Sequence, residues 1–125
     1  MTSSTPAPAE TTAAQVVAVV RDLFFVARIR ETARLAGVPL VVARCPEDVE
    51  AAVAAGARFA LLDLTADWDA ARVLGALDDA GVPVLGFTTH ALARQTQPLH
   101  SRCRRVVTKE TLTAELPALL VEGVR

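Results

Sequence analysis

Five short apolar runs recur along the chain, and between them apolar residues return every three or four positions. The run that begins at Phe59 is apolar without interruption until it reaches Asp63. A strand that is buried on both faces reads this way, and such strands belong to parallel sheets covered by helices. The runs predict strands over Val16–Val20, Leu40–Ala43, Phe59–Leu64, Val82–Phe87 and Val106–Thr108.

Helical patterns fill the gaps between these runs. Leu23–Ala36 carries apolar residues at helical spacing, and Gly37 supplies a left-handed stop. Pro46 and two acidic residues open a second helix, which Gly56 ends. A third helix is predicted over Trp68–Ala80 with Asp67 as its cap, and a short fourth helix is predicted to be capped by Thr89 and to end before Pro98. A last helix, capped by Thr113, would hold Pro117 near its first turn and run to about Glu122. Alternating strands and helices with right-handed crossovers predict a doubly wound α/β domain.

The composition narrows the class of protein. A chain of 125 residues suits one domain, and its 52% hydrophobic but 4% aromatic content predicts a core of valine, leucine and alanine. The net charge of −1 lacks the positive surface expected of a nucleic-acid binder. No apolar run approaches the roughly 18 to 20 residues that span a bilayer. We therefore expect neither a nucleic acid nor a membrane among the partners.

The two ends of the sequence differ in character. Residues 1–15 are small, polar and proline-bearing, which predicts a disordered N-terminal tail without the features of a signal peptide, followed by one domain over residues 16–125. Cys45 and Cys103 form neither a metal-ligand spacing nor a Cys-x-x-Cys pair. We expect a reduced, cytoplasmic protein. Frequent alanine, valine and arginine hint at a GC-rich bacterial genome.

Four polar residues end or follow four of the predicted strands, at the edge where ligands and reaction chemistry collect in α/β sheets. They are Asp22, Asp63, Thr88 and Lys109. With these residues the chain, over about residues 15–123, resembles the receiver domain of bacterial two-component response regulators. The resemblance implies a flavodoxin-like five-stranded parallel sheet of strand order 2-1-3-4-5 with helices on both faces.

The same resemblance implies roles for these residues. Asp63 would accept the phosphoryl group, Thr88 and Lys109 would contact it, and Asp22 and Asp63 would hold Mg²⁺. Magnesium binds through one or two carboxylates plus waters, and phosphoryl transfer is mostly positioning and charge neutralisation.

Several positions depart from the receiver pattern, as in an atypical or pseudo-receiver. Arg21 stands where a second acidic residue is expected, Val106 replaces an aromatic switch residue, and Glu110 replaces the proline after the lysine. The loop after Asp63 lacks its usual proline, and an arginine-rich turn replaces a Gly-Ala pair before the fifth strand. A guanidinium pointing inward would compete with Mg²⁺ and take over the role of the cation. The pattern leaves the direction of Arg21 open.

Each site residue also has a purely structural interpretation. Asp22 can be the N-cap of the first helix, and Thr88 or Thr89 can cap the fourth. Asp63 can be a strand-end carboxylate that pairs with Lys109 or with Arg21 and holds loops together.

A basic cluster precedes the fifth strand. Arg102, Arg104 and Arg105, with Arg94 and His100 nearby, form either a solvated loop or a docking patch for an acidic partner. The resemblance places docking on the face made by the fourth helix, the fifth strand and the last helix.

Three functions remain in view. The first is a stand-alone receiver-like signalling module that is not an enzyme and acts by contact with a protein such as a histidine kinase or an output protein. Its phospho-acceptor site would be impaired, and it would need no cofactor. Such a module can form a homodimer. The second is a functional single-domain response regulator that a histidine kinase phosphorylates on Asp63 with Mg²⁺. The third is a flavodoxin-like or cobalamin-type binding domain, which lacks support because the chain has no phosphate loop and no Asp-x-His-x-x-Gly signature.

Overall fold

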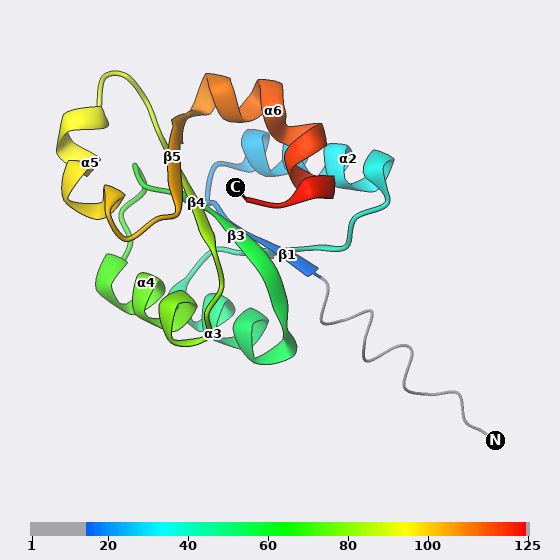
Figure 1. Ribbon diagram of the computed structural model, residues 1–125, viewed down its shortest axis with the longest axis horizontal. Helices are drawn as coiled ribbons and strands as arrows, with labels where there is room; N and C mark the ends of the chain where they lie inside the picture. The colour runs from blue at the N-terminus through cyan, green and yellow to red at the C-terminus, as the bar shows by residue number, and fades with distance from the viewer. Residues whose placement is uncertain (1–14, 125) are drawn as a thin grey trace.

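In a computed structural model, which describes residues 15–124, strands and helices alternate along the chain (Figure 1). The predicted tail lies outside the described residues except for Gln15, which begins the first strand. The elements in chain order are β1 (Gln15–Val19), α2 (Leu23–Ala36), β2 (Leu40–Ala43), α3 (Pro46–Ala55), β3 (Ala57–Asp63), α4 (Ala70–Asp79), β4 (Val84–Thr88), α5 (Ala93–His100), β5 (Arg105–Thr108) and α6 (Lys109–Glu122).

The strands form one parallel sheet in the order β2-β1-β3-β4-β5, which confirms the predicted flavodoxin-like receiver topology. Strands β3, β4 and β5 keep a regular register to their carboxyl ends, so that Asp63 lies beside Phe87 and Thr88 lies beside Thr108. Helices α2 and α6 cover one face, and α3 and α4 cover the other (Figure 1). Because all strands run the same way, their carboxyl ends meet at a single edge.

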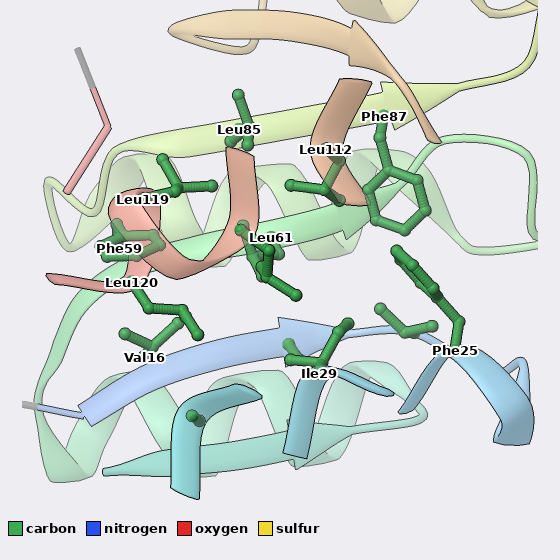
Figure 2. Close-up of a cluster of buried hydrophobic side chains, with 14 of the residues drawn as sticks. Val16, Phe25, Ile29, Phe59, Leu61, Leu85, Phe87, Leu112, Leu119 and Leu120 are labelled. Atoms are coloured by element: carbon green, nitrogen blue, oxygen red, sulfur yellow. The ribbon is translucent and has the colours of Figure 1, made fainter. Parts of the chain in front are cut away.

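The core consists of two apolar clusters, one on each face of the sheet. Successive residues of a strand point to opposite faces, so Leu61 of β3 packs under α2 and α6 while Leu62 packs against the other layer. Figure 2 shows the first cluster, in which the rings of Phe25 and Phe87 meet edge to face with centroids 5.2 Å apart. Each such side chain, once fully buried, contributes about 1.5–3 kcal/mol. This two-sided burial explains the uninterrupted apolar runs.

The starts of α6 and α4 differ from the sequence prediction. Helix α6 begins at Lys109, not after Thr113, because the hydroxyl of Thr108 at the end of β5 accepts a hydrogen bond from the Thr111 amide at 3.2 Å. Pro117 therefore lies well inside the helix and removes one backbone donor there. Helix α4 is likewise capped later in the chain, by Asp69 and not by the predicted Asp67.

The short helix α5 also corrects the prediction. The Thr89 hydroxyl accepts a hydrogen bond from the Leu92 amide at 3.2 Å, but this closes a turn before the helix, which begins at Ala93. The helix does not end before Pro98 but continues through it to His100. The left-handed stop at Gly37 is confirmed, with φ of 69°. None of the helices within residues 15–124 is both long and apolar enough to cross a membrane.

Candidate functional site

The four predicted residues do lie at one edge of the sheet, since each follows or ends a parallel strand. Asp22 follows β1, Asp63 ends β3, Thr88 ends β4 and Lys109 follows β5. The geometry shows, however, that each of them has a different set of partners from the one that the receiver pattern implies.

Asp22 is both a helix cap and an ion-pair partner. Its Oδ1 accepts hydrogen bonds from the amides of Phe24 at 3.0 Å and Phe25 at 3.3 Å, which confirms the N-cap interpretation. Its Oδ2 lies 3.0 Å from the Nζ of Lys109, and both side chains are about 41% exposed. The hydrogen bond from Lys109, followed by that from the Phe25 amide, lowers the pKa of Asp22. Both of its carboxylate oxygens are thus in use.

Asp63 is buried, with 9% of its surface exposed, and is held by its own loop. Its Oδ1 accepts hydrogen bonds from the amide of Thr65 at 2.9 Å and from the Thr65 hydroxyl at 2.6 Å. This is an Asx-type turn that stabilises the chain as it leaves the strand. The predicted pairing of Asp63 with Lys109 or Arg21 is not found among the ion pairs of residues 15–124. Its Oδ2 has no hydrogen-bond partner in this part of the chain.

Arg21 forms no ion pair with either carboxylate in the described residues. Its guanidinium carbon lies 4.3 Å from the centre of the Trp68 ring, and its nitrogens donate to the carbonyls of Asp67 at 2.7 Å and Arg44 at 3.2 Å. The indole in turn donates to the backbone carbonyl of Asp63 at 2.6 Å. Arg21 therefore ties three loops together and does not take over the role of a cation. Sequence analysis did not identify Trp68 as its partner, because the two are far apart in the chain.

Thr88 is buried, and its hydroxyl is held under α5 instead of capping a helix. It accepts a hydrogen bond from the Thr96 hydroxyl at 3.1 Å, and that oxygen lies 2.8 Å from Nε2 of His100. The Thr96 hydroxyl also lies 3.2 Å from the carbonyl of Ala93. Sequence analysis missed this line of polar groups, although a threonine and a histidine four residues apart share one side of a helix.

Magnesium is the ion that the receiver pattern implies at this edge. The residues do not fit it as they are arranged, because Asp22 is engaged by Lys109 and two amides, and Asp63 offers one carboxylate oxygen. Within residues 15–124 no three histidine, cysteine, aspartate or glutamate side chains cluster in a way that could hold a metal ion. Metal binding would require Asp22 to release Lys109.

A hollow of about 490 Å³ opens beside the Asp22–Lys109 pair, between the beginnings of α2 and α6. Asp63 does not line it. The walls combine aromatic, basic and hydroxyl groups: Asp22, Phe24, Phe25, Arg28, Thr89, His90, Thr108, Lys109, Glu110 and Thr113.

The predicted basic cluster does not act as one patch. Arg105 pairs with Glu115 of α6 at 3.0 Å. Arg102 and Arg104 are exposed, form no ion pair in the described chain and lie beside a smaller hollow of about 230 Å³ that Asp78 also lines. Two of the three arginines therefore remain available to a partner.

No protein-family model matches the chain, and no curated protein matches it in sequence. Its fold matches solved receiver domains. A response regulator receiver domain from Rhodospirillum rubrum is 19% identical with a TM-score of 0.63, over 86% of this chain and 91% of that one. The receiver domain of a sensor histidine kinase from Pseudomonas aeruginosa, which has a magnesium ion coordinated in its active-site cleft, is 17% identical with a TM-score of 0.69, over 85% and 93%.

A de novo designed Rossmann 2x3 protein matches as well, at 13% identity and a TM-score of 0.60, over 89% of this chain and 91% of that one. A designed scaffold with the same arrangement shows that these similarities establish the fold and not an activity. The function has to be argued from the site residues.

Proposed function

We propose that the chain is a receiver-type signalling module that acts by contact with another protein, and that its phospho-acceptor site is impaired. One observation carries this proposal: the groups that would bind a phosphoryl group already have partners within the chain. Lys109 is paired with Asp22, the Thr88 hydroxyl is bonded to Thr96, and one oxygen of Asp63 is bonded to Thr65.

Phosphoryl transfer depends on cations and donors that are in place before the reaction. Here Lys109 would have to leave Asp22, and Thr88 would have to leave Thr96. Each of these changes breaks a hydrogen bond that contributes about 0.5–1.5 kcal/mol to the stability of the fold. Lys109, the Thr88 hydroxyl and Oδ1 of Asp63 already have partners without a metal or a phosphoryl group, so both should bind weakly.

The partner that we propose is a protein, such as a histidine kinase or an output protein. The unpaired side chains of Arg102 and Arg104 suit an acidic surface on that partner. The two cysteines of the chain are free thiols, which supports work in a reducing compartment such as the cytoplasm. We propose no chemical reaction that the module itself would catalyse.

A second candidate function is a working phospho-acceptor, and one observation favours it. The Oδ2 of Asp63 has no hydrogen-bond partner in the described chain, although the side chain is buried. A free carboxylate oxygen at a strand end is what attack on a phosphodonor requires. The receiver with bound magnesium among the structural neighbours supports Mg²⁺ as the ion.

The experiment uses beryllofluoride, a phosphoryl mimic, with Mg²⁺, and follows the fluorescence of Trp68, the single tryptophan of the chain. Its indole donates to the backbone of Asp63, so an occupied acceptor should alter its emission. We expect no saturable change at millimolar Mg²⁺. A saturable change that disappears in Asp63→Asn would establish the second function. Intact-mass measurement after incubation with a small phosphodonor gives an independent reading.

A further inference from the structure

Helix α2 exposes large apolar side chains that the described chain does not cover. Its inner side is buried against the sheet through Phe25, Val26, Ile29 and Ala33. Its outer side carries Leu23, Phe24 and Leu35, which are 62%, 89% and 72% exposed. Among residues 15–124, only Val121 of α6 is another large apolar residue exposed to this extent. Apolar surface concentrated in this way on one element indicates a binding surface.

Four residues form a stripe along this outer side. Phe24, Arg28, Glu31 and Leu35 are spaced by four, three and four positions, which places them on one side of the helix. The stripe is apolar at both ends and has a cation and an anion in the middle. Arg28 forms no ion pair and no side-chain hydrogen bond in the described chain. Glu31 is paired only with Arg34 of its own helix.

We propose that two copies of the chain associate through this stripe, with their α2 helices antiparallel about a two-fold axis. Reversal of the second helix places Phe24 opposite Leu35 of the other copy, and Arg28 opposite Glu31. A parallel arrangement would instead place arginine against arginine and glutamate against glutamate. A two-fold interface requires a surface that complements itself, and the order of these four residues meets that requirement in the antiparallel direction.

The surroundings of the stripe permit the approach of a second helix. Ala27, which lies beside the stripe, is small and exposed. Phe24 borders the hollow of about 490 Å³, so its ring can settle toward that space as the other copy covers it. In Figure 1, α2 lies at the outside of its layer, next to α6. A helix of 14 residues is about 21 Å long, so the contact is small and the dimer is expected to be weak.

The inference goes beyond the proposed function, because it does not depend on whether Asp63 accepts a phosphoryl group. It also uses a different face from the predicted docking surface at α5, β5 and α6. Loss of the dimer and failure of the signalling proposal are therefore separate results.

The test is sedimentation velocity of the full chain over a wide concentration range. We expect concentration-dependent dimerisation of the wild type. Arg28→Glu and Glu31→Arg each place like charges opposite one another at both symmetric positions, and each should raise the Kd by about tenfold. The double variant restores the opposite charges and should recover most of the wild-type affinity. An equimolar mixture of the two single variants should do the same by forming a mixed dimer.

Arg94→Glu is the matched control, since Arg94 is an exposed arginine on α5 with no ion pair in the described residues. It should leave the Kd unchanged, and circular dichroism should show that all variants keep the fold. Phe24→Ser and Leu35→Ser should both weaken the dimer. A wild type that stays monomeric at every concentration would overturn the proposal. So would charge reversals that behave like Arg94→Glu, or a double variant no better than its parents.

Discussion

Asp22 and Asp63 are the same residue type at the same edge of the sheet, yet the fold uses them in opposite ways. Asp22 is half exposed and connects distant segments, because it caps α2 and pairs with Lys109 at the start of α6. The side chain of Asp63 is buried, and within the described residues it binds only the residue two positions further along its own loop. The first carboxylate holds two helices, and the second shapes one turn. A carboxylate at a strand end is therefore not evidence of chemistry until its partners are known.

The strongest contrast is in stability. Asp22→Ala removes the cap of α2 and the partner of Lys109, and we expect it to lower the free energy of unfolding by about 1–2 kcal/mol. Asp63→Asn keeps an oxygen that accepts from Thr65, and should cost less than about 0.5 kcal/mol. Urea denaturation of both variants measures the difference. A larger loss in Asp63→Asn would reverse the roles that we assign.

The loop around Asp63 gives a second contrast. Thr65→Val removes the hydroxyl that lies 2.6 Å from Oδ1 of Asp63, and we expect a loss of about 1 kcal/mol in the free energy of unfolding. Thr65→Ser retains the hydroxyl and serves as the control. Thermal and urea unfolding of the pair would show whether the hydroxyl matters, and equal stabilities would argue that the amide alone shapes the turn.

The contact between Asp22 and Lys109 should contribute less. Lys109→Met keeps most of the packing over the ring of Phe25, which lies 4.7 Å from the ammonium, but removes the charge. Because both partners are about 41% exposed, solvent screens the pair, and a double-mutant cycle with Asp22→Asn should give a coupling of about 0.2–1 kcal/mol. A coupling near zero would mean that Asp22 acts as a cap alone.

The smallest expected effect is on the pH dependence of stability. The pKa of Asp22 is lowered in the fold, so ionised Asp22 stabilises the protein above its unfolded-state pKa. This contribution should disappear as the pH falls through the lowered pKa in the acid range. Asn is also a good cap but does not titrate, so the stability gap between the wild type and Asp22→Asn should shrink on acidification. Urea midpoints at a series of pH values measure it, and a constant gap would contradict the linkage.

The sequence was sufficient for the fold because the fold depends on local periodicity. The run from Phe59 to Leu62 has to be buried on both sides, which a parallel sheet between helices provides. The cap at Asp22 is local as well, since the amides that donate to it lie within three residues. The start of α6 was predicted wrongly because Pro117 was assumed to need a first-turn position, whereas the strand end at Thr108 decided the cap.

The site was less predictable because its contacts are made through space. Arg21 had two kinds of possible partner, the two carboxylates and an indole that lies 47 positions away. Which of them it contacts depends on which side of the sheet edge each loop occupies. The same holds for Lys109 and its partner Asp22, which are 87 residues apart. Spacing along the chain contains no information about such a choice.

The hydrogen bonds that link Thr88, Thr96 and His100 restrict which of these side chains can donate a proton. A hydroxyl has a single proton, so when Thr96 donates to Thr88, the hydrogen between Thr96 and His100 has to come from Nε2 of the imidazole. When Thr96 donates instead to Nε2, that nitrogen carries no hydrogen, and Thr88 is free to turn its own proton toward Thr96. Between these two arrangements the tautomer of one half-buried ring and the orientation of a hydroxyl at the end of β4 change together, and the nitrogen resonances of His100 would report the change.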